Sequence, residues 1–291
     1  NPYIYDKETI ENLTTIPIIG VIRRYQDAID EDNRQILSIK NPKSLFAESV
    51  RSVRTNLSFL AAEKQSKIVC ITSEISGEGK SFTTVNLAST LSLIEKKVIV
   101  IAADLRRSKL HHTFKTSNLK GLSSYLSNQA ELAEITFDTE VENLTFIPAG
   151  PVPPNPSELL YSDKMKALLE LLTQSYDFVI VDSAPVGLVS DAIPLIRMAD
   201  VNLFVIRSGV SRYQAASVPE RLSKEFNLSN IAIILNAFDN DILHSRYYTT
   251  NYSGSYYASY YYYSDYSSTG YGGGYYSDGP TKKWWEFWKR K

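Results

Sequence analysis

A short run, Gly77-Glu78-Gly79-Lys80-Ser81, has residue types and a spacing that suit it to bind phosphate. An apolar run over 67–73 precedes it and predicts a strand, and a helical pattern over 80–95 follows it. In this setting the glycines let backbone N–H groups curl around an anion, and the helix N-terminus adds partial positive charge. We therefore expect Lys80 to reach the β- and γ-phosphates of a nucleotide, and the Ser81 hydroxyl to ligate Mg²⁺.

The run matches only part of the full phosphate-loop pattern. The first glycine of G-x-x-x-x-G-K-S/T falls on Glu74, so the match is confined to the second half. A chance Gly-Lys-Ser in a βα turn is the alternative, but the strand before the loop and the helix after it favour nucleotide binding. The predicted nucleotide contacts in this stretch are Gly77, Glu78, Gly79, Lys80, Ser81 and Phe82.

Two further apolar runs end in carboxylates. Asp182 follows the run 178–181, and Asp104 follows the run 98–103 and precedes Arg106. Because the carboxyl ends of parallel strands meet at one edge of a sheet, we expect both carboxylates beside the phosphate loop. With Ser81 they are predicted to hold the metal ion, while the Arg106 guanidinium neutralises phosphate charge. An aspartate that merely caps its strand is the alternative.

The bulk composition excludes several classes of protein. A chain of 291 residues with 43% hydrophobic content predicts one large domain with appendages. Its single cysteine, Cys70, lies in the strand before the loop and excludes a disulfide framework. A net charge of −1 gives no global nucleic-acid signal, so we expect no nucleic-acid partner. No apolar run approaches membrane-spanning length, but a start at Asn1 without Met is compatible with a fragment of a membrane protein.

Strand and helix patterns alternate through the middle of the chain. The predicted strands are continuous apolar runs at 67–73, 97–103, 143–148, 176–182, 201–207 and 230–236. The predicted helices are 80–95, 121–129, 157–174 (with Ser157 as its cap), 190–199 and 214–226. Continuous apolar strands are buried on both faces, which predicts an α/β fold with a mostly parallel central sheet flanked by helices. Earlier in the chain, 16–22 predicts a short strand, and Pro42 begins an amphipathic helix.

The composition changes after Asp241, where Tyr, Ser, Gly and Asn replace the aliphatic residues of a core. We interpret 245–280 as a disordered tail, since it cannot bury enough apolar surface to become ordered. Flexible tyrosines suit a phosphoacceptor segment, and a sticky low-complexity segment is the alternative. The candidate phosphoacceptors are Tyr247, Tyr248, Tyr252, Tyr256, Tyr257, Tyr260, Tyr261, Tyr262, Tyr263, Tyr266, Tyr271, Tyr275 and Tyr276. The basic, aromatic terminus 281–291 could contact a membrane interface or another protein.

In their joint order these features resemble the bacterial tyrosine kinases, the cytoplasmic kinase modules of Wzc-like polysaccharide co-polymerases. The resemblance rests on the 77–81 loop, Asp104-Leu105-Arg106, Asp182-Ser183-Ala184-Pro185 and the tyrosine-rich tail. It implies a P-loop NTPase fold of the MinD/ParA type. It also implies an ATP- and Mg²⁺-dependent protein-tyrosine autokinase that phosphorylates its own tail, mostly between subunits of a ring, and so regulates capsule or exopolysaccharide synthesis and export.

The resemblance implies further roles outside the loop. Glu48, Arg51 and Arg54 match the family's E-x-x-R-x-x-R subunit-contact motif, although a solvated helix face is the alternative. Asn236 is expected to read adenine, or else simply to end its strand. The expected partners are further copies of the chain, a transmembrane chain-length-determinant region and a tyrosine phosphatase, at the cytoplasmic face of the bacterial inner membrane. The predicted segments are a juxtamembrane part (1–41), a P-loop kinase domain (42–244), the tyrosine-rich tail (245–280) and the basic aromatic terminus (281–291).

One departure from the family's pattern concerns Ala102. The family's second Walker strand ends in Asp-x-Asp, and its first Asp is thought to accept the tyrosine proton; here only Asp104 remains. Asp104 or Asp182 would have to take that role, or positioning and charge alone would lower the barrier. A weak kinase or an engineered substitution is also compatible with Ala102. The alternative function is a MinD/ParA-like ATPase switch or a pseudokinase scaffold, in which nucleotide binding drives oligomerisation without phosphoryl transfer.

Overall fold

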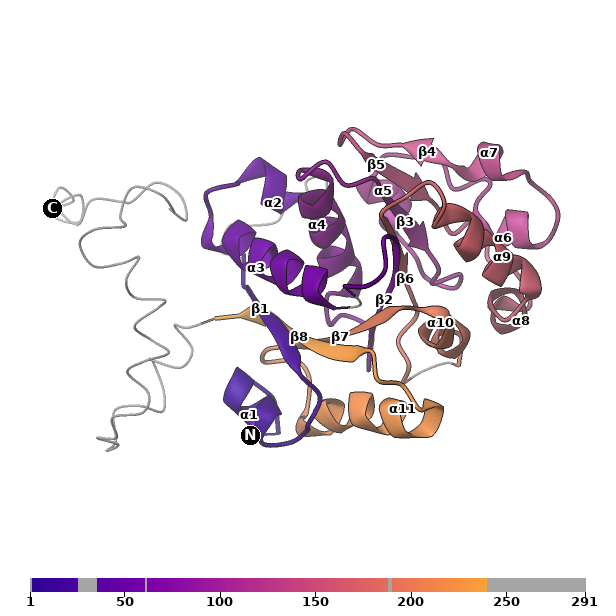
Figure 1. Cartoon of the computed structure of the whole chain (residues 1–291). Helices are drawn as coiled ribbons and strands as arrows, with labels where there is room; N and C mark the ends of the chain where they lie inside the picture. Colours follow the sequence, from indigo (N-terminus) through magenta and orange to yellow (C-terminus); the bar gives the residue numbers. More distant parts are fainter. Residues whose placement is uncertain (1, 26–35, 61, 188–189, 240–291) are drawn as a thin grey trace, which may run out of the picture.

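The computed structural model describes residues 2–25, 36–60, 62–187 and 190–239, and in this part of the chain one eight-stranded sheet forms the centre of the molecule (Figure 1). The candidate phosphoacceptor tyrosines, the predicted tail and the terminus 281–291 lie outside the described residues. The strands are β1 (Ile18–Arg23), β2 (Lys67–Ser73), β3 (Val98–Ala102), β4 (Phe137–Asp138), β5 (Leu144–Ile147), β6 (Phe178–Asp182), β7 (Val201–Arg207) and β8 (Ile231–Phe238).

The strands follow the order β1-β8-β7-β2-β6-β3-β5-β4. Every neighbouring pair is parallel except β4 with β5. The central strands β2, β3 and β6 are buried along their whole length, because helices cover both faces and leave no position for a solvated side chain. The predicted α/β fold with a mostly parallel sheet is therefore confirmed.

The helices are α1 (Lys7–Glu11), α2 (Leu37–Lys40), α3 (Leu45–Phe59), α4 (Lys80–Ser92), α5 (Leu110–Thr113), α6 (Leu122–Leu126), α7 (Leu132–Ile135), α8 (Pro156–Leu160), α9 (Asp163–Leu172), α10 (Ala192–Met198) and α11 (Val218–Phe226), with a 3₁₀ turn, η2 (Tyr213–Ser217), before α11. Helices α3 and α4 pack together on one side of the sheet, and α11 lies on the other side next to β8 (Figure 1). Right-handed crossovers produce this arrangement, since the chain moves from β2 to β3 in one direction and from β7 to β8 in the other. No helix in the described ranges is both long and apolar enough to cross a bilayer.

Three predicted helices differ from the observed ones, and of these the helix predicted at 121–129 is only shorter, ending at Leu126. The helix predicted at 157–174 is divided into α8 and α9, because Ser162 adopts an extended conformation and its hydroxyl caps α9 by accepting from the Met165 N–H at 3.2 Å. Ser157 is not the cap of α8: Asn155 occupies the cap position, and the Ser157 hydroxyl donates to Asp191 instead. The helix predicted at 214–226 begins as the 3₁₀ turn η2 and continues as α11.

The N-terminal part of the chain contributes directly to the sheet. β1 pairs in parallel with β8, so the edge of the sheet includes residues from the segment predicted to precede the kinase domain. The amphipathic helix expected from Pro42 begins at Leu45, where the Ser44 hydroxyl caps it by accepting from the Ala47 N–H at 3.1 Å. Its apolar face, which includes Val50 and Val53, is fully buried.

A candidate nucleotide-binding site at the carboxyl edge of the sheet

The phosphate loop connects the end of β2 to the start of α4, and its shape depends on two glycines. Gly77 and Gly79 have φ values of 90° and 92°, in the left-handed region that favours glycine. A Cβ at Gly79 would lie 2.1 Å from the Nδ2 of Asn236, so this position also lacks room for a side chain. Gly79 is the N-cap of α4, which directs the helix N-terminus and the Lys80 side chain to the same place as the loop.

Two residues at the ends of neighbouring strands hold the backbone of this loop. The Asn236 amide donates to the Glu78 carbonyl at 3.0 Å from β8, and the Arg207 guanidinium donates to the Gly77 carbonyl at 2.7 Å from β7. These two contacts hold the loop through its carbonyls, so they do not occupy the N–H groups that would receive an anion. In this structure Asn236, which we expected to read adenine, is buried against the loop itself.

Asp182 lies at the end of β6 and faces the first turn of α4. Its carboxylate accepts hydrogen bonds from the Ser81 hydroxyl at 2.7 Å and the Thr84 hydroxyl at 3.3 Å. Burial raises the pKa of Asp182 to about 6, while the Lys80 ammonium and the Ser81 hydrogen bond oppose this rise. A hydroxyl and a carboxylate oxygen side by side below a phosphate loop are the donors that Mg²⁺ uses together with nucleotide phosphates.

Asp104 follows β3, and the structure brings its backbone next to Asp182. The Asp104 N–H donates to the Asp182 carbonyl at 3.1 Å, so the two predicted metal ligands end neighbouring strands. Its carboxylate oxygen Oδ1 accepts from the backbone N–H groups of Arg106 at 3.2 Å and Arg107 at 3.0 Å, which caps the turn after β3. Ala102 is fully buried, and the β3–β6 register places it opposite Asp182.

The Arg106 side chain is engaged in an ion pair that the sequence reasoning did not anticipate. Its Nε lies 2.5 Å from Oδ2 of Asp191 and its Nη2 lies 3.2 Å from Oδ1, so the pair is bidentate. Asp191 is buried and also accepts from the Ser157 hydroxyl, and these donors hold the pKa of Asp191 below its usual range despite its burial. Nothing in the spacing signalled Asp191, because it lies in the loop after β6 and precedes α10.

Two other groups of predicted residues lie away from the loop's anion-binding side. The Phe82 ring packs against Phe46 of α3, with 5.4 Å between ring centroids, so its side chain contributes to the core. On α3, Arg51 pairs with Glu48, with 2.7 Å between Nη2 and Oε2. Arg54 donates to the Thr90 carbonyl at 2.8 Å near the end of α4. Glu48 and Arg51 thus remain on the helix surface, while the Arg54 side chain links α3 to α4.

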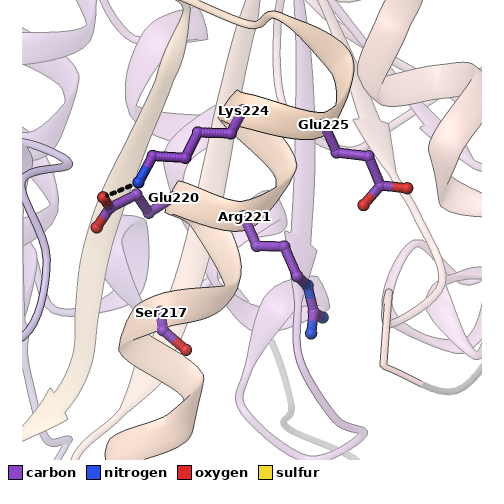
Figure 2. A pocket seen from close by; sticks show the side chains of 5 residues that line it. All are labelled: Ser217, Glu220, Arg221, Lys224 and Glu225. Carbon is purple, nitrogen blue, oxygen red and sulfur yellow. Dashed lines mark hydrogen bonds and ion pairs between the residues drawn. The ribbon is translucent and has the colours of Figure 1, made fainter.

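A hollow on the outer side of α11 is separate from this site. Figure 2 shows its lining residues, Ser217 at the end of η2 and four residues of α11; of these, Lys224 and Glu220 form an ion pair between successive turns of α11, at 2.7 Å. None of the residues predicted to bind nucleotide lines it. Because it is open and lined by charged helix residues, it provides no convergent set of groups for a small ligand.

Comparison with known proteins identifies the family of this chain. A family model described as an AAA domain matches residues 66–220. The tyrosine-protein kinase YwqD of Bacillus subtilis is 40% identical over 191 residues, which cover 65% of this chain and 81% of that protein. The tyrosine-protein kinase etk of Escherichia coli is 37% identical over 204 residues, which cover 70% of this chain but only 28% of that protein.

Solved structures extend the similarity to the fold. The kinase domain of the Escherichia coli tyrosine kinase ETK superposes with a TM-score of 0.75 at 33% identity, covering 87% of this chain and all of that domain. The BceF tyrosine kinase domain also gives a TM-score of 0.75, at 35% identity, and covers 81% of this chain. The chain therefore belongs to the bacterial tyrosine kinase family, as its motifs predict, and is a protein-tyrosine kinase built on a P-loop nucleotide-binding fold.

Proposed function

We propose that this chain transfers the γ-phosphoryl group of ATP to the tyrosines of 247–276, mostly on neighbouring copies of itself. The observation that supports this best is the contact between Ser81 and Asp182 beneath the phosphate loop, with 2.7 Å between Oγ and Oδ2. Phosphoryl transfer needs little covalent chemistry from the protein, so a preorganised set of charges beside a flexible acceptor segment is sufficient.

The residues at this point fit a Mg²⁺ ion. Asp182 is a fully buried carboxylate whose partners include two hydroxyls, and Ser81 opens α4 directly after the loop. Mg²⁺ takes one or two protein oxygens and completes its shell with water and phosphate, so the absence of a cluster of three acidic or histidine ligands in the described residues is compatible with it. When bound, the ion would neutralise phosphate charge. Ser81 and Asp182 would hold it, with Asp104 in the turn after the neighbouring strand β3.

The remaining side chains have distinct proposed roles. Lys80 would contact the β- and γ-phosphates from the start of α4. Arg106, oriented by its ion pair with Asp191, would stabilise charge on the transferred group. Asp104 is our candidate for accepting the tyrosine proton, because among the described residues its Oδ2 receives no hydrogen bond whereas both oxygens of Asp182 do.

We place this activity in a homo-oligomeric ring at the cytoplasmic face of the bacterial inner membrane, regulating capsule or exopolysaccharide synthesis and export. Glu48, Arg51 and Arg54 on α3 would contact a neighbouring subunit. A transmembrane chain-length-determinant region and a tyrosine phosphatase would be the other partners. Each phosphotyrosine adds nearly two negative charges, so modified tails would repel one another and release the ring.

A second candidate function is an ATPase switch or pseudokinase scaffold, and Ala102 favours it. Ala102 lies opposite Asp182 in the register, at the position where the family resemblance implies the first Asp of Asp-x-Asp. In that case ATP binding would drive assembly and the tyrosines would bind partners unmodified.

Intact-mass spectrometry after incubation with Mg-ATP tests the choice, with Lys80→Met as the matched inactive chain. Several additions of about 80 Da on the wild type, mapping to 247–276, support the kinase function. Mixing wild type with a size-tagged Lys80→Met chain then tests transfer between copies, because only transfer in trans adds phosphate to the inactive chain. ATP binding without any added mass would favour the switch or scaffold.

A further inference from the structure

The Glu78 side chain has an unusual environment for a carboxylate in a phosphate loop. It is fully buried, at 0% exposure, although side chains of this type are rarely buried without a cationic partner. Within the described part of the chain no Lys or Arg pairs with it; its oxygens accept instead from the Ile75 N–H at 2.8 Å and from the Ser211 hydroxyl. Burial raises the pKa of Glu78, and these two hydrogen bonds together with the nearby Ser73 hydroxyl oppose the rise. A buried carboxylate held in this way has a definite position.

Ser211 is a rigid anchor for that carboxylate. It lies in the turn between β7 and η2, where its Oγ accepts from the Arg207 N–H at 2.8 Å and its own N–H donates to the Arg207 carbonyl at 2.9 Å. Its carbonyl accepts from the Ile4 N–H at 2.9 Å, so the N-terminal segment fixes the turn from the other side. Because the hydroxyl oxygen accepts from Arg207, its one proton is left to be donated to Glu78.

The loop needs such an anchor because its own backbone is permissive. Gly77 and Gly79 flank Glu78, and both adopt positive φ. Because glycine has no Cβ, steric clashes restrict the backbone of this segment only weakly. The two carbonyl contacts from Arg207 and Asn236 tie the loop's backbone to β7 and β8. The Glu78 side chain adds a hydrogen bond from within the loop itself to Ser211 in the β7–η2 turn.

We propose that Glu78 is a positioning residue for nucleotide binding: by anchoring the phosphate loop to Ser211, it keeps the loop's N–H groups arranged to receive phosphate. The proposal rests on the proposed nucleotide site and assigns a role to a side chain that is buried in the protein. Without the anchor, only a fraction of the free protein has a binding-competent loop, and the apparent Kd rises by the inverse of that fraction. Bound phosphate restores the loop, so turnover at saturation changes little.

The test compares Glu78→Ala with Glu78→Gln and with Glu74→Ala. Titration with a fluorescent ATP analogue and Mg²⁺ should show a Kd about tenfold higher for Glu78→Ala, which loses two hydrogen bonds. Glu78→Gln should restore near wild-type affinity, because its amide oxygen can accept from Ile75 and its amide N–H can donate to Ser211. Glu74→Ala removes a carboxylate from the same loop that makes no hydrogen bond among the described residues, so it should not raise the Kd.

A second variant shows whether Glu78 acts through Ser211. Ser211→Ala should raise the Kd several-fold, and the double variant should be no weaker than Glu78→Ala alone. When the phosphorylation rate is measured as a function of ATP concentration, kcat should stay within about threefold of wild type in all of these variants. The KM for ATP should instead follow the Kd. A general loss of folding would instead lower the thermal midpoint of Glu78→Ala and reduce its folded fraction, without changing the Kd of the molecules that remain folded.

The outcomes separate this proposal from the kinase function. An unchanged Kd in Glu78→Ala, or additive effects of the two alanine substitutions, would overturn the positioning role even if tail phosphorylation is robust. A Kd that follows the predicted order in a chain that never phosphorylates its tail would support the positioning role while removing the autokinase proposal. A lowered kcat with unchanged KM would contradict the positioning role, because it would assign Glu78 to the chemical step.

Discussion

Replacing Asp182 by Asn should stabilise the metal-free protein although it removes a proposed metal ligand. In the structure burial raises the pKa of Asp182 to about 6, compared with an ordinary value of 3.8. The difference between these values corresponds to roughly 3 kcal/mol of stability lost at high pH. Asn has nearly the same size and keeps one acceptor for the Ser81 hydroxyl. The variant therefore removes the cost of the buried charge, and the hydrogen bond from the Thr84 hydroxyl to the second oxygen is the main contact that it loses.

The pH dependence gives the sign of this effect. A carboxyl group with a raised pKa in the folded state contributes its full stability below its unfolded pKa, and this stability is lost as the pH rises through the folded value. The stability of the wild type should therefore fall between about pH 4 and pH 7 relative to the variant. From pH 5 to pH 8 the advantage of Asp182→Asn should grow by about 1.5 kcal/mol, whatever constant offset the lost hydrogen bond adds.

Urea unfolding followed by far-UV circular dichroism, in EDTA at pH 5 and pH 8, measures this change directly. Ser81→Ala is the control of opposite sign, because it removes a hydrogen bond that lowers the pKa of Asp182 and so should destabilise the protein more at pH 8. With Mg-ATP the order should reverse at pH 8, since a ligand stabilises only the protein that binds it. The same advantage at both pH values would refute the reasoning, because it would mean that Asp182 does not ionise at a cost in the free protein.

Three further predictions concern Ala102, Asp191 and Arg51. Ala102→Asp should lower the free energy of unfolding of the metal-free protein by about 3 kcal/mol, because the register places a second buried carboxylate opposite Asp182. Urea unfolding with and without Mg-ATP measures this change, and an equal loss in both conditions would contradict the prediction. Asp191→Asn should lower Tm at pH 7 but much less at pH 3. A carboxylate with a depressed pKa stabilises the folded protein above its unfolded pKa, and this contribution is lost as the pH falls through the folded pKa. A change in Tm that does not depend on pH would argue against the prediction. Arg51→Ala should reduce the oligomer mass in sedimentation velocity without changing Tm by more than a few degrees, because its partner Glu48 is an exposed neighbour on the same helix; an unchanged mass would remove α3 from the proposed interface.

The central sheet was predictable because it is governed by burial alone. β2 has the same limits in the sequence and in the structure, since a strand buried on both faces has no freedom to include polar residues before its end. The short elements were not predictable: β4 has two residues and α2 has four, so neither provides a periodic pattern. The break between α8 and α9 depends on one serine that caps a helix from within an apolar periodic segment.

The site divides in the same way. That Ser81 and Asp182 would lie together was predictable, because a phosphate loop is local in sequence and parallel strands align their carboxyl ends. The partners of these motifs are distant in the chain and follow no pattern. Arg106 finds its carboxylate 85 residues away, and Glu78 its hydroxyl 133 residues away. Such contacts follow from how loops meet at the edge of the sheet.

The burial of Asp182 also gives a physical reason for Ala102. Asp182 is already a buried carboxylate whose pKa is raised by burial and, to a smaller extent, by Asp104. A third carboxylate at position 102, directly opposite Asp182 in the register, would add like charge at the most buried point of the site. With alanine there, the metal-free site carries less repulsion, and our candidate for the tyrosine proton acceptor is Asp104, in the turn after β3. Asp104 is suited to this because backbone N–H groups hold one of its oxygens in place. A chain that phosphorylates its tail at a rate unaffected by Asp104→Asn would show that neither position supplies the base, and that charge and positioning alone carry the reaction.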